Sequence, residues 1–115
     1  MKEIVIANLS IDFALRIVNL YKYLCNDKSE YVMSKQLLRC GTSIGANIAE
    51  SEHAQSAADF ISKLYIALKE ANETKYWLTL LFKSEYLNEK EYESMMKDLR
   101  IIIGTLVNTI KKTKE

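Results

Sequence analysis

The sequence predicts an all-α protein, an antiparallel up-and-down four-helix bundle in which residues 1–115 form a single domain. Proline is absent and glycine occurs only three times, so the turn residues of a strand-and-turn fold are missing. Apolar residues recur every three or four positions along four segments, which is the period of amphipathic helices. A chain of 115 residues can enclose one hydrophobic core but not two.

The composition is that of an ordinary soluble domain, with 49% hydrophobic and 27% charged residues. The 16 Lys and Arg residues nearly balance the 15 Asp and Glu residues, and the net charge is +1. Proteins that bind nucleic acid without sequence preference are usually more basic. The charge balance therefore disfavours general phosphate binding, but it leaves a local basic patch open.

No feature of the sequence indicates a membrane span or an export signal. No apolar run approaches the ~18 residues of a membrane span, and Met1–Ala7 lacks the long apolar stretch and cleavage site of a signal peptide. Cys25 and Cys40 lack the CxxC spacing of a metal site and are expected to be reduced thiols packed as small apolar groups. We therefore expect a cytoplasmic protein with no membrane partner.

The first predicted helix begins near residues 4–10 and runs to about Cys25. Its core-facing side chains form a single stripe of Phe13, Ile17, Leu20 and Leu24. In the following loop, Asp27 and Glu30 have the spacing of a capping box, and Ser29 is a competing N-cap. So short a connection predicts that the first two helices are antiparallel neighbours.

The second predicted helix, Tyr31–His53, is the segment around which the bundle is organised. Its apolar line consists of Leu37, Ile44 and Ile48. Gly41 and Gly45 lie along one edge of this line. Each interior glycine costs about 0.5–1 kcal/mol relative to alanine, so the pair predicts a partner helix packed unusually close. The opposite edge carries polar groups that need hydrogen-bond partners wherever they are buried: Gln36, Cys40, Ser43, Asn47 and Glu50.

The third predicted helix, Ala57–Ser84, has more apolar surface than one core face uses. Its core line is Phe60, Leu64, Ala67, Ala71, Thr74, Leu78 and Phe82, with Leu81 beside it. Further apolar or aromatic side chains flank that line: Ile61, Tyr65, Ile66, Tyr76, Trp77 and Leu80. The surplus predicts self-association. At its start the sequence leaves two alternatives open, a new helix capped by Ser56 or a kinked continuation of the second helix.

The fourth predicted helix follows residues 88–91, where Asn88 is a cap and Glu91 has the reciprocal capping-box position. Its core-facing residues are Tyr92, Met95, Met96, Leu99, Ile102, Ile103, Leu106 and Ile110. The final lysines of the chain complement the helix dipole and indicate a solvated end rather than a nucleic-acid tail.

Two segments carry a resemblance to a known family. SKQLLRCGTSIGANIAES in the second predicted helix and FISKLYIALKEANETKYWLTLLF in the third resemble the small bacterial proteins encoded in intervening sequences of 23S ribosomal RNA genes. The resemblance implies a four-helix bundle that assembles as a ring of five subunits, without an established activity. A related accessory protein of diversity-generating retroelements is similar and binds nucleic acid and a reverse transcriptase. Where family members often show Ser, this chain has Cys40, a small-for-small change that leaves the expected fold intact.

Glu50 and His53 have the ExxH spacing that di-iron carboxylate bundles use. Such a site needs a second ExxH motif and two further glutamates, and this chain has a single histidine. Helical geometry also turns both side chains away from the apolar line of the second helix. We therefore expect no metal and no cofactor.

Glu70 and Glu73 lie three residues apart, side by side on the third helix. A pair of acids can serve general acid–base catalysis, but no nucleophile, glycine-rich loop or second histidine accompanies them. In the structural alternative, Glu70 bonds Ser43 and Asn47 of the second helix, while Glu73 pairs with a lysine or lines a subunit contact. We favour the structural role and expect no enzymatic activity and no small-molecule substrate.

Lys35 and Arg39, four residues apart on the second helix, are the best local basic pair. They are candidates for contacting nucleic-acid phosphates, and a ring of subunits would repeat the contact. An ordinary charged, solvated face is the simpler interpretation. Tyr65, Tyr76 and Trp77 are able to stack on bases, but aromatic residues at helical spacing more often pack or form interfaces.

The sequence thus favours a non-enzymatic, homo-oligomeric interaction protein, with nucleic-acid binding as the alternative. Glycines permit close helix approach, polar residues form a network, and an aromatic anchor completes the assembly motif. Its members are Gly41, Ser43, Gly45, Asn47, Glu50, Glu70, Glu73 and Trp77.

Overall fold

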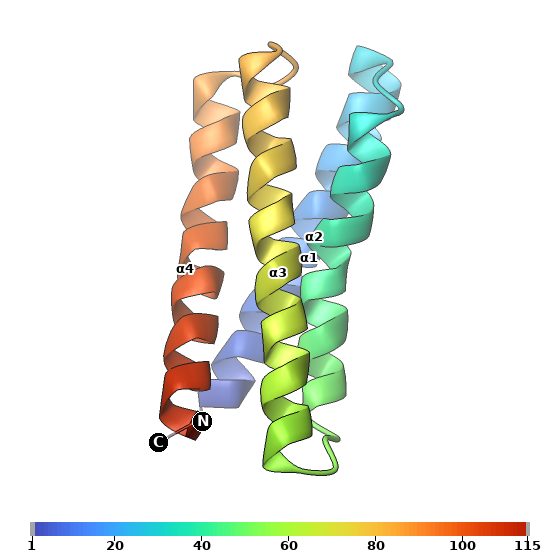
Figure 1. Ribbon diagram of the computed structural model, residues 1–115. Helices are drawn as coiled ribbons and strands as arrows, with labels where there is room; N and C mark the ends of the chain where they lie inside the picture. Colours follow the sequence, from blue (N-terminus) through green and yellow to red (C-terminus); the bar gives the residue numbers. More distant parts are fainter. Residues whose placement is uncertain (1, 115) are drawn as a thin grey trace.

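The computed structural model describes the backbone of residues 2–114 and the side chains from Ile6 onward. It contains four helices and no strand in that range. The helices are α1 (Lys2–Lys28), α2 (Met33–Ser51), α3 (Ala57–Lys83) and α4 (Glu89–Lys114). Short connections join them into an elongated body of 44 × 21 × 19 Å (Figure 1). The prediction of an all-α fold with four helices is confirmed.

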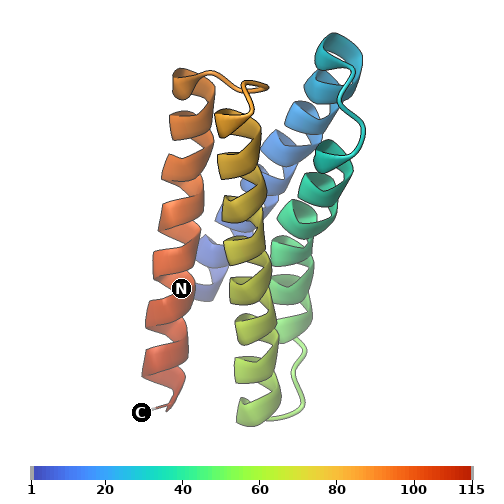
Figure 2. The ribbon, with the colours of Figure 1, turned by 45° about the horizontal axis from the view of Figure 1, so that its top comes forward.

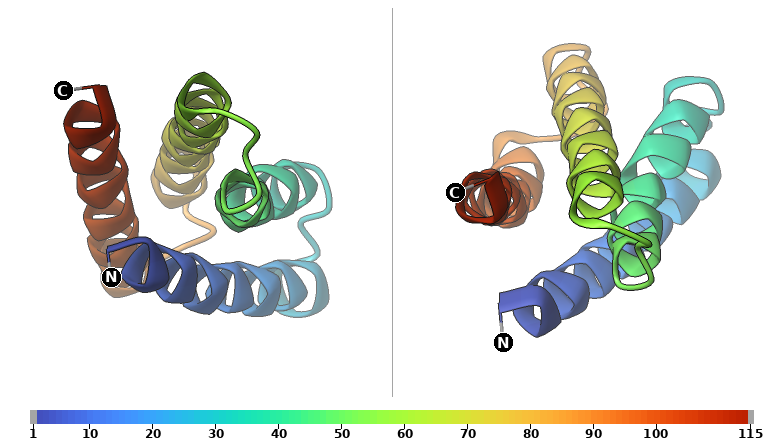
Figure 3. Two further views of the ribbon diagram at one scale, coloured as in Figure 1. Left: turned by 90° about the horizontal axis from the view of Figure 1, so that it is seen from below. Right: turned by 60° about the horizontal axis from the view of Figure 1, so that its bottom comes forward.

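The helices pack in the order of the chain. α2 contacts both α1 and α3, α4 contacts α3, and α1 and α4 close the ring with the thinnest contact (Figure 3). α1 is oblique to the other helices, so that it passes behind α3 from the α4 side toward the start of α2 (Figure 2). The contacts of α2 with α1 and α3 therefore make up most of the packing between helices.

The core is formed by apolar side chains from all four helices. The largest fully buried ones are Phe13, Ile17, Leu24, Leu37, Ile44, Leu64, Leu78, Leu81, Met96, Leu99, Ile102 and Leu106. Eleven of them lie on the predicted core lines, and Leu81 was predicted beside one. Five other predicted core residues are half-buried at the margin: Leu20, Phe60, Phe82, Tyr92 and Ile103. They lie at the edges of their stripes, and Phe82 stacks on Tyr92 with ring centroids 4.5 Å apart.

The end of α1 differs from the predicted one. The helix continues beyond Cys25 to Lys28. It stops where Ser29 adopts a left-handed φ of 53° and the backbone N–H of Glu30 donates to the carbonyl of Leu24 at 2.9 Å. A left-handed residue followed by such a bond is a common way to end a helix.

Glu30 is the cap of α2. Its carboxylate accepts the backbone N–H groups of residues 32–34 at distances of 2.7 to 3.2 Å. The predicted capping box with Asp27 is wrong, because Asp27 belongs to α1 and the Glu30 side chain turns forward to α2. α2 is also shorter than the predicted Tyr31–His53, since it begins at Met33 and ends at Ser51.

The two other helix starts agree with the sequence. Ser56 has an extended backbone and its hydroxyl accepts the Asp59 N–H at 3.1 Å, so α3 is a new helix and not a continuation of α2. Asn88 and Glu91 form the predicted reciprocal capping box, with both bonds at 2.8 Å. Across residues 2–114, none of the helices combines the length and apolar character needed to cross a bilayer.

Candidate functional site

Arg39 is the centre of a charged cluster on the surface between α2 and α3, which we call the α2–α3 seam (Gln36, Arg39, Glu70, Glu73 and Trp77). Its guanidinium donates to Glu70 at 3.3 Å and to the carboxylate of Glu73, and its Nε donates to Gln36 at 3.3 Å. The Arg39 side chain is 49% exposed, whereas Glu70 is 17% exposed. The arginine thus lies across the seam and joins the two helices.

Electrostatics in this cluster favour the charged arginine. Partial desolvation acts to lower the pKa of Arg39, but the negative charges of Glu73 and Glu70 act in the opposite direction and prevail. The pKa of Arg39 is therefore raised above its ordinary value. The guanidinium remains a cation whose nearest counterions are two carboxylates of α3.

Trp77 extends the seam by one turn of α3. Its indole Nε1 donates to the Glu73 carboxylate at 3.2 Å. The ring of Tyr76 lies edge-on to the indole, with centroids 5.1 Å apart. The predicted anchor is therefore half-buried and fixed by a carboxylate that also binds Arg39.

Beneath the seam, Cys40 is fully buried, although the sequence placed it on the polar edge of α2. The Thr74 hydroxyl donates to its Sγ at 3.3 Å. Burial raises the pKa of the Cys40 thiol, and the bond from Thr74 offsets only part of the rise. Cys40 is thus a neutral packing group, and both it and Cys25 are free thiols.

Ser43 and Asn47 do not bind Glu70, contrary to expectation. The Ser43 hydroxyl donates to the Arg39 carbonyl at 2.7 Å and the Asn47 amide donates to the Ser43 carbonyl at 2.9 Å. Both side chains make their hydrogen bonds within their own helix. The longer side chain of Arg39 binds Glu70 instead. Glu50 joins α2 to α3 independently, through Lys63 at 3.2 Å.

The ExxH pair lies at the solvent-exposed end of α2. Glu50 and His53 are both exposed, and His53 lies beyond the last helical residue. Among residues 2–114 no group of three or more His, Cys, Asp or Glu side chains is placed to hold a metal ion.

The two residues of the predicted basic pair, Lys35 and Arg39, lie in different surroundings. Lys35 is exposed to solvent, whereas Arg39 faces the carboxylates of the seam. A phosphate approaching Arg39 would have to compete with two glutamates. The structure therefore gives this pair little of the character of an anion site.

Gly41 and Gly45 lie where α2 meets α1. A β-carbon on Gly41 would lie 2.8 Å from a side-chain carbon of Ile17, and one on Gly45 would lie 3.3 Å from the hydroxyl oxygen of Ser10. Both distances are shorter than ordinary van der Waals contact. The predicted close approach of a partner helix is confirmed, and α1 is that partner.

An uncharged hollow of about 270 Å³ runs over this glycine contact, and we call it the α1–α2 groove. It is lined by Ser10, Ile11, Ala14, Leu15, Val18, Thr42, Gly45 and Ala46. Ile11 and Leu15 are each 58% exposed, more than any large apolar side chain of α3 except Tyr76. Sequence reasoning missed this surface, although Ile11, Leu15 and Val18 form a second apolar stripe at helical spacing on α1.

A larger hollow of about 450 Å³ lies between α1 and α4. Arg16 lines this hollow, and its guanidinium donates to Asp98 at 2.6 Å and to the Ser94 hydroxyl at 2.7 Å. Because these bonds join α1 to α4, the guanidinium serves the contact between the two helices.

The fold and its surfaces define a small all-α bundle protein whose helices are joined by a charged seam and a glycine contact. The family model for 23S rRNA-intervening sequence proteins matches residues 2–108, and the chain belongs to this family. The resemblance inferred from the sequence is therefore confirmed.

A solved relative supports the same conclusion. The crystal structure of a protein with unknown function from the S23 ribosomal protein family of Bacteroides thetaiotaomicron has a TM-score of 0.96 to this chain and is 59% identical to it. The match covers 96% of this chain and 99% of that one. A comparison with curated proteins finds no match.

Proposed function

We propose that this protein is a non-enzymatic, homo-oligomeric interaction protein. In this proposal an antiparallel up-and-down four-helix bundle assembles with copies of itself as a ring of five subunits, the arrangement implied by the family resemblance. The observation that carries the proposal is the α1–α2 groove, an exposed apolar surface whose lining contains no charged residue.

The free energy available from covering the groove supports the proposal. Ile11 and Leu15 are 58% exposed and lie one helical turn apart, so one partner surface can cover both. Burying a fully exposed aliphatic side chain contributes about 1.5–3 kcal/mol, so two half-exposed ones offer a comparable amount. A second copy of the chain satisfies this need without another protein.

A closed ring of five requires two different surfaces on each subunit, because the contact is head-to-tail. The α1–α2 groove is one of them. Exposed apolar side chains on the other two helices, Ile66 of α3 and Ile101 and Val107 of α4, are candidates for the second. The surplus apolar surface that the sequence predicted for α3 agrees with this assignment.

The non-enzymatic part of the proposal is supported by the state of the acid pair. Glu70 and Glu73, the best candidates for acid–base chemistry, are both engaged by Arg39, and Glu73 also accepts a bond from Trp77. Such carboxylates hold helices together. The free thiols of Cys25 and Cys40 agree with the cytoplasmic location that we propose.

The test compares two charge substitutions at exposed apolar positions. Leu15→Glu places a carboxylate in the groove and is expected to shift the protein to smaller species in light scattering. Tyr31→Glu is the matched control, because Tyr31 is 61% exposed outside the groove, and it is expected to keep the wild-type mass. Equal masses for wild type and Leu15→Glu, with unchanged circular dichroism, would contradict the role of the groove.

A further inference from the structure

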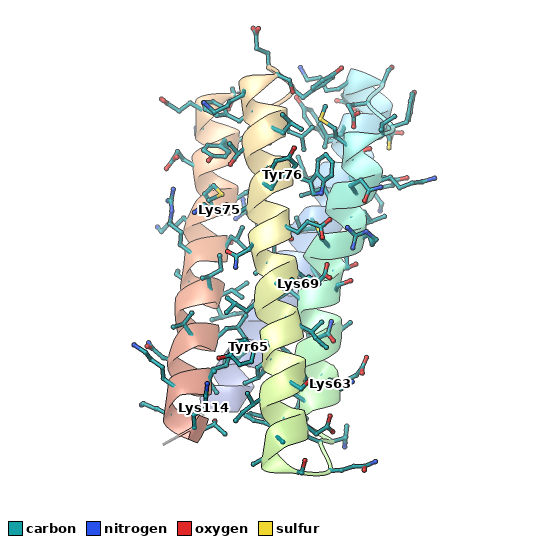
Figure 4. The ribbon with its side chains drawn as sticks, in the orientation of Figure 1. Lys63, Tyr65, Lys69, Lys75, Tyr76 and Lys114 are labelled. Atoms are coloured by element: carbon teal, nitrogen blue, oxygen red, sulfur yellow. The ribbon has the colours of Figure 1, made fainter. Side chains whose placement is uncertain are left out.

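A stripe of aromatic, basic and amide side chains runs along the outer face of α3. Tyr65, Lys69, Asn72 and Tyr76 follow one another at intervals of four, three and four residues, which keeps them on one line of the helix. All four are exposed. Figure 4 shows Tyr65, Lys69 and Tyr76 along the length of α3, on the face of the bundle turned toward the viewer.

The charge on this face is positive. Lys69 and Lys75 lie along α3, and Lys114 reaches the same face from the end of α4 (Figure 4). The acids of α3 that are nearest in sequence, Glu70 and Glu73, lie on the side of the helix toward α2, where Arg39 pairs with both. Both carboxylates are therefore already engaged by Arg39.

One further lysine of α3 is already paired. Lys63 lies 3.2 Å from Glu50. Lys69, Lys75 and Lys114 supply positive charge on this face. Lys69 and Lys75 are six residues apart, or about 9 Å along the helix axis.

The tyrosines offer flat surfaces between these charges. Tyr76 is 59% exposed and Tyr65 is 46% exposed. Lys114 lies over the Tyr65 ring, with its Nζ 5.6 Å from the centroid and 3.4 Å from the hydroxyl. Tyr76 is supported from the side by Trp77, so its ring is held in place while one surface remains open.

We propose that this lysine–tyrosine face of α3, with the last turn of α4, binds single-stranded nucleic acid. Lysine ammonium groups contact the phosphates, and the tyrosine rings stack on unpaired bases, which is the combination that sequence-tolerant single-strand binding uses. The face lies on the α3–α4 side of the bundle, away from the α1–α2 groove. A partner seated in that groove therefore leaves this face uncovered, and a ring would multiply the contact.

The first experiment measures fluorescence anisotropy of a labelled oligouridine RNA of about 20 nucleotides at a low and a moderate salt concentration. We expect binding that weakens with salt, and a loss of roughly tenfold in affinity for the double variant Lys69→Ala, Lys75→Ala. The matched control is Lys22→Ala, Lys35→Ala, which removes the same charge from exposed positions of α1 and α2. The control is expected to bind as the wild type does.

The second experiment tests stacking. Tyr76→Ala is expected to weaken binding by roughly tenfold, whereas Tyr31→Ala, an equally exposed tyrosine elsewhere, leaves it unchanged. Trp77 is the only tryptophan, and its contact with Tyr76 makes its fluorescence a local reporter that the oligonucleotide should change.

Three results would overturn the inference. One is the absence of binding at low salt. Another is an equal loss in the control lysine pair, which would indicate diffuse electrostatic attraction. The last is that a duplex binds as tightly as the single strand and that Tyr76→Ala does not weaken binding. This result would mean that the protein contacts phosphates but does not recognise unpaired bases.

Discussion

Gly41 of α2 lies directly against Ile17 of α1. A β-carbon on Gly41 would come within 2.8 to 2.9 Å of three side-chain carbons of Ile17, closer than packed atoms approach one another. Ile17 is completely buried, so its side chain has little room to retreat. The helix contact therefore depends on the absence of one methyl group.

We predict that Gly41→Ala destabilises the protein. Overpacking a buried site costs about 1–3 kcal/mol, which exceeds the gain of up to about 1 kcal/mol from better helix propensity. Urea unfolding measures the net change. Gly104→Ala is the control, because nothing lies within 4 Å of a β-carbon there, and it is expected to stabilise by about 0.5–1 kcal/mol. Equal stabilisation by both substitutions would contradict the close contact.

A larger side chain at Gly45 is expected to affect stability and assembly together. Gly45 faces Ser10 of α1 and also lines the α1–α2 groove. Gly45→Leu should therefore wedge α1 from α2 and fill the surface that we assign to the partner subunit. Thermal unfolding and light scattering measure the two effects, and an unchanged melting temperature with an unchanged mass would refute the role of this glycine.

The Glu30 cap is expected to make the stability of α2 depend on pH. Burial acts to raise the pKa of the Glu30 carboxyl. Hydrogen bonds from the backbone N–H groups of Met33, Ser34 and Val32 act in the opposite direction and prevail, so the pKa lies below its ordinary value of 4.5. The unfolded chain then binds the proton more readily. The stabilisation is therefore complete above the ordinary pKa and is lost as the pH falls through the folded pKa.

Glu30→Ala tests this cap. It is expected to lower the free energy of unfolding by about 1 kcal/mol at neutral pH, and the difference from wild type should shrink in acid. Glu52→Ala, at an exposed position past the end of α2, should show neither effect. A difference for Glu30→Ala that stays constant from neutral pH to about pH 3 would show that the carboxylate charge is not responsible.

Arg39→Met is expected to change stability only slightly. The arginine side chain is half-exposed, and exposed ion pairs contribute little once solvent screening is included. We expect a small decrease in melting temperature that diminishes at high salt. A large decrease that is independent of salt would mean that the aliphatic part of the side chain packs more tightly than its exposure indicates.

The helices and the core followed from sequence because their signals are local. The helical repeat alone is enough to recognise a periodic stripe such as the one through Phe13, Ile17 and Leu24. The caps at Ser56 and Asn88 likewise depend on residues three positions apart. The glycine contact was also predictable, because two glycines one turn apart weaken a helix unless a neighbouring helix packs closely against them.

Contacts between distant side chains could not be read in this way. The partner of Glu70 was expected to be Ser43 or Asn47, because both lie on the polar edge of the second helix. The longer side chain of Arg39 reaches Glu70 instead. The shorter side chains of Ser43 and Asn47 donate to backbone carbonyls of α2. Glu30 was misjudged because a carboxylate can bind donors on either side of it, and spacing alone does not distinguish them.

Self-association is expected to cover the exposed apolar surface of this chain. Sedimentation equilibrium of the wild-type protein at micromolar concentration measures it. We predict a mass several times the 13.3 kDa of one chain, with five subunits as the expected number. A single species of 13.3 kDa that does not change with concentration would show that the chain does not self-associate.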